Sequence, residues 1–198
     1  MVLKLISQPL DWPLIDNEGE QEICHDWFGQ PLAQPARFRL IQDSNLLWLI
    51  AKRDCNASPD PSATCGEFKA GLWHYDVAEL FITTPDFKQY LEFNLSPSGA
   101  WWVALFCGPR RRSKLNGLPK VICRADPMES GGWIAALGIP LAWLRQNIDW
   151  GPNSPLNVTF ILDSPDQRFL SACQMGSGEP DFHRPRHFKP PNRRSPRA

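Results

Sequence analysis

The sequence lacks any apolar run long enough to cross a membrane. A spanning helix needs roughly 20 predominantly apolar residues, and polar or charged residues interrupt every hydrophobic stretch before that length. Residues 1–10 also lack the long apolar region and the small-residue cleavage site of a secretory signal peptide. These absences favour a cytoplasmic protein that has no membrane partner.

The motifs of common enzymes are missing as well. The chain contains no G-x-S-x-G, no phosphate-binding P-loop and no G-x-G-x-x-G, which are the sequence forms of many hydrolases and nucleotide-binding enzymes. Asp76 and Glu79 suggest the carboxylate pair of a glycosidase. Residues three apart in a strand face opposite sides, however, so this pair is badly placed for acid–base catalysis. We therefore expect no catalytic activity and no cofactor.

Disulfide and metal patterns are also sparse. The six cysteines include no C-x-x-C pair, and in a cytoplasmic chain they are expected to be reduced thiols. Cys55 and Cys65 flank a Pro- and Ser-rich loop and would be the pair to bond if the protein were exported. His183 and His187 have the spacing of a helical metal pair, but Pro185 breaks such a helix, so we expect no metal site.

Charge is distributed unevenly along the chain. Residues 183–198 hold six Lys or Arg residues and no acid, which leaves 15 basic and 21 acidic side chains in residues 1–182, a net charge of −6. An acidic body carries no general signature of nucleic-acid binding, so we expect no nucleic-acid partner. We predict one domain over 1–182 and a poorly ordered Arg/Pro-rich tail over 183–198. Binding of this basic tail to RNA or to an acidic partner is the less favoured alternative to a disordered, solubilising end.

The dominant hydrophobic period is two. Ala36, Phe38 and Leu40 alternate with Arg37 and Arg39, which is typical of a half-buried strand. We expect strands over 36–40, 46–53, 77–83, 90–95, 100–106, 121–125, 133–139, 157–162 and 169–174. One short helix is expected over 140–147, with Pro at its start. No βαβ alternation is present, so the sequence predicts an all-β fold, an antiparallel β-sandwich of immunoglobulin-like or jelly-roll type.

Three segments carry a family resemblance. Residues 71–82 read GLWHYDVAELFI, residues 90–94 read YLEFN, and residues 132–144 read GWIAALGIPLAWL. In this order they resemble the type 9 carbohydrate-binding module family within the larger DOMON-like group, where a Trp precedes a strand of the form D-x-V-E-L-F. The resemblance covers roughly residues 30 to 175.

The resemblance implies a sandwich that holds a sugar between aromatic rings. Trp73 matches one ring of the family's clamp, Glu79 matches an acceptor for sugar hydroxyls, and Asn94 matches a polar contact on the next strand. Glu92 departs from the family, because modules that bind sugars tend to carry Arg at this position. The second ring of the clamp stays open between three candidates: Trp102, Trp150 and Phe182.

The residues themselves fit sugar chemistry. Aromatic rings pack on the apolar C–H faces of sugars, and carboxylates or amides pair with the hydroxyls. Tyr90, Glu92 and Asn94 share one strand face by the period of two. We expect Glu79 to be buried, ionised and paired with Asn94 or with the arginines at 110–112, because a buried carboxylate among apolar neighbours needs a partner. The basic loop at 110–114 is either a solvated turn or a site for an acidic or phosphorylated sugar.

We therefore predict a non-catalytic module that binds a saccharide or glycan. The residues predicted to contact the ligand are Trp73, Glu79, Glu92, Asn94, Trp102 and Arg110. One alternative is a structural or protein-interaction domain that has lost sugar binding. A further alternative is a haem-binding redox domain of the DOMON-like group, with Met175 and His183 as its axial ligands.

Overall fold

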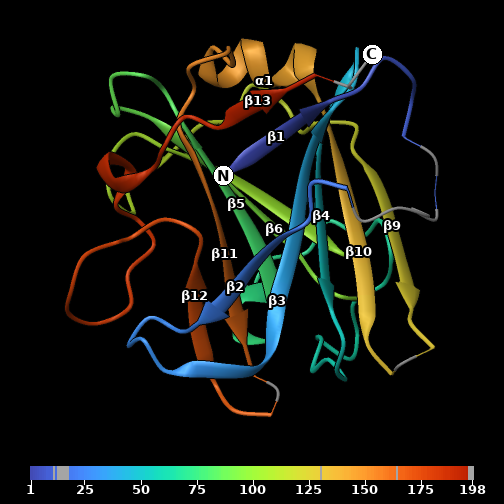
Figure 1. Ribbon diagram of the computed structural model, residues 1–198. Helices are drawn as coiled ribbons and strands as arrows, with labels where there is room; N and C mark the ends of the chain where they lie inside the picture. Colours follow the sequence, from blue (N-terminus) through green and yellow to red (C-terminus); the bar gives the residue numbers. More distant parts are fainter. Residues whose placement is uncertain (11, 13–17, 130, 164, 196–198) are drawn as a thin grey trace.

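The fold consists of two β-sheets packed face to face, seen in a computed structural model that describes residues 1–10, 12, 18–129, 131–163 and 165–195 (Figure 1). Within these residues the first sheet has seven strands, in the order β13-β1-β3-β4-β10-β9, with β2 beside β3. Its strands are β1 (Val2–Leu5), β2 (Gln21–His25), β3 (Pro31–Gln42), β4 (Leu46–Arg53), β9 (Ile122–Pro127), β10 (Trp133–Pro140) and β13 (Asn192–Arg194).

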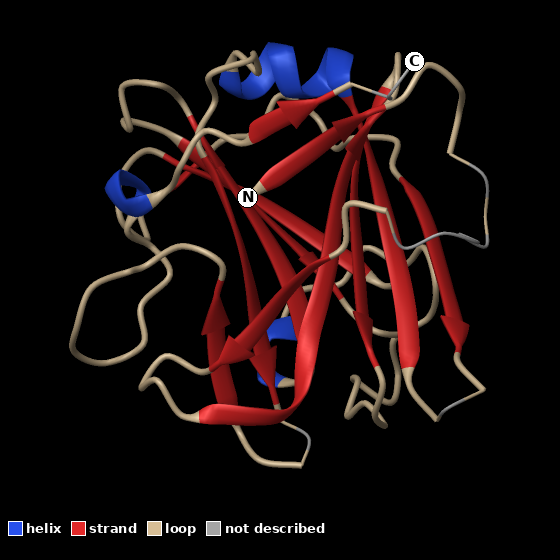
Figure 2. Ribbon diagram, viewed as in Figure 1, coloured by secondary structure: helices blue, strands red, loops and turns tan. Residues whose placement is uncertain are grey.

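The second sheet has six strands among the described residues, in the order β12-β11-β5-β6-β7-β8. They are β5 (Val77–Thr83), β6 (Tyr90–Leu95), β7 (Trp101–Phe106), β8 (Arg112–Ser113), β11 (Leu156–Leu162) and β12 (Arg168–Ser171). The helix α1 (Leu141–Ile148) lies at one end of the two layers (Figure 2). Together with the sheets it confirms the predicted β-sandwich with one short helix.

The core between the sheets follows the period of two. Apolar side chains from alternate positions meet there, including Phe38, Leu49 and Leu137 from the first sheet and Leu80, Phe93 and Val158 from the second. Each of these side chains is almost completely buried. Because the alternate residues of β5, β6 and β7 point the other way, the second sheet has an outer face of its own. A second cluster of buried hydrophobic residues, half of them aromatic, covers this face.

Two features depart from the expected antiparallel sandwich. The strand β1 pairs in parallel with both β3 and β13, whereas the other strand pairs are antiparallel among the described residues. In addition, the strands β1, β2, β8 and β13 were not expected. All four have five residues or fewer, too few to show a hydrophobic alternation, and β2, β8 and β13 are also charged or polar at most positions.

The C-terminal segment differs from the expected poorly ordered tail. Residues 185–187 form a short 3-10 helix, η2 (Pro185–His187), and β13 pairs with β1. Phe182 and Phe188 are buried against the outer face of the second sheet, where both rings contact Phe81. The physical reason is that burial of these two rings stabilises the segment by more than its Pro and Arg residues favour disorder. Residues 196–198 of the predicted tail lie outside the described residues.

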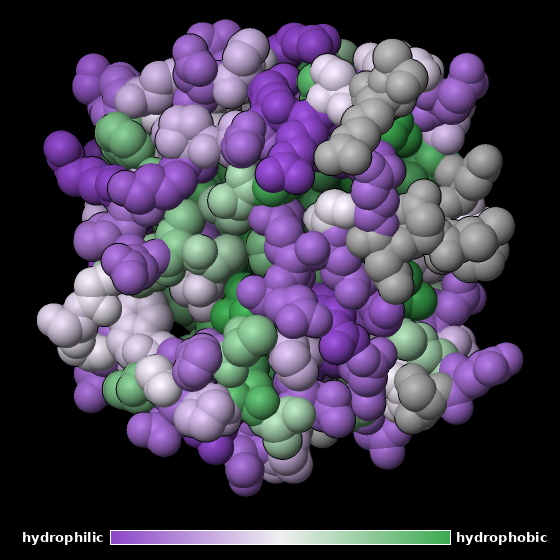
Figure 3. All heavy atoms as spheres, in the orientation of Figure 1, coloured by the Kyte–Doolittle hydropathy of each residue, from purple (hydrophilic) through white to green (hydrophobic). Residues whose placement is uncertain are grey.

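The surface is mainly polar on the face shown in Figure 3, where hydrophobic residues show as smaller areas between hydrophilic ones. In the described part of the chain, no helix has the length and apolarity needed to cross a membrane. All six cysteines are free, so the considered Cys55–Cys65 disulfide is not formed in this structure.

Candidate functional site

A pocket of about 370 Å³ opens on the outer face of the second sheet. Side chains from β5, β6, β7 and β11 form its floor, and the C-terminal segment with Phe182 and His183 forms one wall. The aromatic rings that line it are Trp73, Phe81, Trp102, Phe106, Phe169 and Phe182. Two carboxyl side chains, Glu79 and Glu92, also line it. A pocket with apolar walls and a few polar groups is the usual form of a small-molecule site.

Trp73 reaches the pocket through a tight turn. Gly71 has a φ of 88°, a left-handed conformation that glycine adopts without a steric penalty, and it precedes the short helix η1 (Leu72–His74). This turn brings the half-buried Trp73 ring against Trp102, with 5.1 Å between ring centroids and 65° between the planes. The two rings therefore meet edge to face and do not form the two parallel plates of a clamp.

Trp101 and Trp102 point to opposite sides of β7, as adjacent strand residues must. Trp101 lies in the core between the sheets, and Trp102 lines the pocket. The Arg112 guanidinium carbon lies 4.9 Å from the centre of the Trp102 ring, a cation–π contact. Of the three candidates for a second clamp ring, Trp102 and Phe182 line the pocket, whereas Trp150 is buried in the core between the sheets.

Glu79 is buried in the pocket floor, but it has no cationic partner among the residues that the structure describes. Its Oε2 accepts a hydrogen bond of 2.7 Å from the Thr159 hydroxyl on β11. Burial first, and then the charge of Glu92, raise the pKa of Glu79 to about 8. The prediction that Glu79 is buried is confirmed. The prediction that it is ionised and paired with a cation or an amide is wrong, because its partner is the Thr159 hydroxyl and its raised pKa favours the protonated form at neutral pH.

Glu92 lies on the neighbouring strand, where it is paired in register with Phe81, two residues from Glu79. Burial raises the pKa of Glu92 to about 7, against the opposite effects of Asn94, Arg112 and Arg110. In the amide orientation that satisfies its neighbours, Asn94 donates to Glu92 Oε1 at 3.2 Å and to the Phe93 carbonyl. Asn94 is fully buried and lies outside the pocket lining, so the structure places this predicted contact residue behind Glu92.

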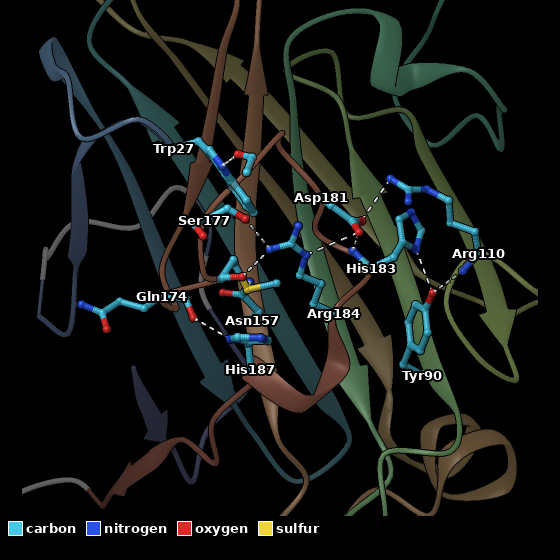
Figure 4. A network of polar contacts seen from close by, with 12 residues as sticks. Trp27, Tyr90, Arg110, Asn157, Gln174, Ser177, Asp181, His183, Arg184 and His187 are labelled. Carbon is cyan, nitrogen blue, oxygen red and sulfur yellow. Dashed lines mark hydrogen bonds and ion pairs between the residues drawn. The ribbon is translucent and has the colours of Figure 1, made fainter.

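His183 joins the C-terminal segment to the pocket floor (Figure 4). The Tyr90 hydroxyl lies 2.8 Å from His183 Nδ1 and accepts a hydrogen bond of 3.1 Å from the Arg110 backbone N–H. Burial, and after it the charge of Arg110, lower the pKa of His183 to about 4, so the imidazole is neutral. The other ring nitrogen, Nε2, lies 3.7 Å from Glu92 Oε2.

Arg110 lies at the rim of the pocket with most of its side chain exposed. It forms an ion pair of 3.0 Å with Asp181, and Arg184 approaches the same carboxylate at 3.5 Å. Arg184 also donates to the carbonyls of Met175 and Ser177, which holds the loop before His183 in place (Figure 4). Arg110 thus fixes the wall of the pocket in addition to lining it.

The haem alternative needs Met175 and His183 at one site. Met175 is buried beside Asn157, whose side-chain amide donates to its sulfur at 3.4 Å, and it lines a different cavity from His183. His183 Nδ1 forms a hydrogen bond with the Tyr90 hydroxyl. The two side chains therefore have separate partners. In the described ranges, no group of three or more His, Cys, Asp or Glu residues is arranged to hold a metal ion.

Sequence reasoning missed several pocket residues. Phe182 was only one of three candidates for a ring, while Phe169, Pro180 and His183 were not connected with the sugar. Pro180 and His183 lie in a loop and in the predicted tail, where no period marks which side chains turn inward. The run 181–183, Asp-Phe-His, was the available signal, because it combines an apolar ring with two titratable groups in a segment otherwise rich in Pro and Arg.

Solved structures share this fold. A carbohydrate-binding module of family 9 from Caldicellulosiruptor kristjanssonii, in complex with glucose, aligns over 98% of this chain and 97% of its own, with a TM-score of 0.60 and 12% identity. A structure of a family 9 module from the same organism with cellotriose gives a TM-score of 0.62 at 10% identity, over 99% and 94% of the two chains. A protein from Bacteroides uniformis, described as a candidate carbohydrate-binding protein, gives 0.66 at 17% identity, over 88% and 86%. The fold is thus that of a carbohydrate-binding module of family 9.

The sequence itself places the chain more narrowly. It is 31% identical over 180 residues to the mouse (Mus musculus) UPF0462 protein C4orf33 homolog, covering 85% of this chain and 88% of that protein. The chain therefore belongs to the UPF0462 family. No model of a known protein family matches it.

Proposed function

We propose that the pocket on the outer face of the second sheet binds a saccharide and carries out no reaction on it. The observation that supports this most is the lining itself, in which aromatic rings and two carboxyl groups surround about 370 Å³. Rings such as Trp102 and Phe182 offer apolar faces to sugar C–H groups, and the carboxyl groups offer partners to hydroxyls. The solved family 9 modules with glucose and cellotriose, which share the fold, agree with this proposal.

The finer proposal of an acidic or phosphorylated sugar has weak support. An anion would need the rim arginines, but Arg110 is paired with Asp181 and Arg112 stacks on Trp102. An anion would also face Glu79 and Glu92 in the floor. A neutral or positively charged sugar fits these charges better. A cytoplasmic location and the absence of a nucleic-acid partner remain predictions.

A calorimetric titration tests the proposal, with glucose and cellotriose added to the protein. We expect the Trp73→Ala variant to bind at least about tenfold more weakly, because it removes one aromatic wall, and a tenfold change corresponds to about 1.4 kcal/mol. Phe28→Ala is the control, since Phe28 is an exposed ring outside the pocket lining. Equal binding by the wild type and the Trp73 variant would contradict a site at this pocket.

A structural or protein-interaction domain is the second candidate, and one observation favours it. Phe182 and His183 pack against Phe81, and His183 also contacts Tyr90 and Phe106, so the C-terminal segment fills part of the outer face. Together with the edge-to-face contact of Trp73 and Trp102, this arrangement lacks an open parallel clamp. The same titration separates the two candidates, because a purely structural domain binds no sugar at millimolar concentration.

A further inference from the structure

Two carboxyl groups lie side by side in the floor of the pocket, and among the described residues neither forms an ion pair with a Lys or Arg side chain. Glu79 and Glu92 are on the adjacent strands β5 and β6, offset diagonally by two residues, and each residue is at most 5% exposed. Across the described residues their polar neighbours are the Thr159 hydroxyl, the Asn94 amide and the His183 ring at 3.7 Å. None of these neighbours carries a positive charge at neutral pH, since His183 is neutral there.

The walls around these carboxyl groups suit a cation. Trp73, Phe81, Trp102 and Phe106 present their rings to the same space. Aromatic faces attract cationic groups, and the attraction grows when water is excluded. One cation already uses this wall, because the Arg112 guanidinium lies over the Trp102 ring. A cavity with carboxyl groups below and rings at the sides has the chemistry of a site for a protonated amine.

We propose that the saccharide bound in this pocket is an amino sugar whose ammonium group lies against Glu79 and Glu92. This inference rests on the proposed function and names the class of its ligand. The ammonium would stabilise the ionised form of the carboxyl pair, which burial otherwise disfavours. The rings would hold the sugar's apolar face, and the Thr159 hydroxyl and Asn94 amide would keep the two carboxyl groups oriented.

The other charged groups around the pocket leave room for a positive ligand. Arg110 forms an ion pair with Asp181 in the facing C-terminal segment, and most of its side chain is exposed to solvent. Its charge and that of Arg112 still act on Glu92, so a cationic ligand has to bind deeper in the pocket than these two side chains. Arg112 on β8 is exposed to solvent, which screens its repulsion. Tyr90 stays protonated, because burial raises its pKa to about 12.

The carboxyl groups make binding of an amine depend on pH. Without ligand the pKa values of Glu92 and Glu79 are raised to about 7 and about 8. A nearby ammonium lowers both pKa values, so binding releases protons. Affinity for the amine should therefore rise as pH increases from 5.5 to 7.5, whereas affinity for a neutral sugar should change little over the same interval.

The test compares three sugars by calorimetry at pH 7.5: glucosamine, glucose and N-acetylglucosamine, in which acetylation removes the charge. We expect glucosamine to bind at least about tenfold more tightly than the other two, and this preference to fall at pH 5.5. In Glu92→Gln and Glu79→Gln the ratio of glucosamine to glucose affinity should approach one. Glu179→Gln, which removes an exposed carboxylate outside the pocket lining, should keep the ratio.

The outcomes separate this inference from the function on which it rests. If glucose binds as tightly as glucosamine, the pocket binds sugars and the amino-sugar inference is overturned. If the preference survives in both carboxyl variants, the ammonium is not held by Glu79 and Glu92, and the inference is also overturned. If none of the three sugars binds at millimolar concentration, the proposed function fails, and the inference fails with it.

Discussion

Replacing Glu79 by Gln is expected to make the protein more stable at pH 8, by roughly 4 kcal/mol, and to change its stability much less at pH 5, because a change of one in a pKa corresponds to about 1.4 kcal/mol. The pKa of Glu79 is raised from 4.5 to about 8 in the folded protein. The folded state therefore keeps a proton that the unfolded state loses. This contribution to stability is fully present below about pH 4.5 and is lost as pH rises toward 8. The amide of Glu79→Gln does not titrate, so the variant does not lose this contribution as pH rises.

The measurement is urea denaturation of the wild type and Glu79→Gln at several values between pH 5 and pH 8. The free energy of unfolding of the wild type should fall over this range, and the fall should be smaller in the variant. The exposed Glu179→Gln serves as the control and should follow the wild type. Parallel curves for all three proteins would show that Glu79 is ionised in the folded state, as the sequence alone suggested.

Replacing Phe188 by Ala should lower the free energy of unfolding by about 3–4 kcal/mol, the usual cost of removing a large buried ring. Phe188 is 2% exposed and packs on Phe81, with 5.6 Å between the ring centroids. The ring therefore anchors the C-terminal segment to the outer face of the second sheet, beside the pocket wall that His183 provides.

Phe28→Ala provides a matched comparison, because it removes the same ring from a position that is 62% exposed. Its effect should stay within about 0.5 kcal/mol, as for most surface changes. Both variants are measured by chemical denaturation at one pH. A loss below about 1 kcal/mol for Phe188→Ala would mean that the segment after residue 182 contributes little packing, as expected for a poorly ordered tail.

Much of the fold could be predicted because hydrophobic alternation is a local signal. The strands β3 and β6 contain such a pattern, and β4, β5 and β7 are short runs of mostly apolar residues. The period of two also places Trp101 and Trp102 on opposite faces of β7. The parallel pairing of β1 with β3 and β13 has no comparable signal, since it joins segments far apart in the sequence and its strands are short. Pairing of this kind depends on which edges remain open once the sheet has formed.

The pocket could be predicted only in part. Trp73, Glu79, Glu92, Trp102 and Arg110 were expected near the ligand, and all five line one pocket. Their electrostatics could not be predicted, because the charge of a buried carboxyl depends on whether a cation reaches it. Arg110 has a φ of 54° in the turn after β7 and pairs with Asp181, so it does not reach Glu79. Neither that turn nor the position of residue 181 can be inferred from hydrophobic periodicity.

The most direct test of the central claim, that this pocket binds a saccharide, is an NMR titration that follows the indole N–H signals. Glucosamine and glucose are added to millimolar concentration. The account predicts that the signals of Trp73 and Trp102, which line the pocket, shift progressively and saturate. The signal of Trp143 should stay in place, because this residue does not line the pocket and its indole N–H donates a hydrogen bond of 3.0 Å to the Gly117 carbonyl. Unshifted Trp73 and Trp102 signals with both sugars would contradict the claim.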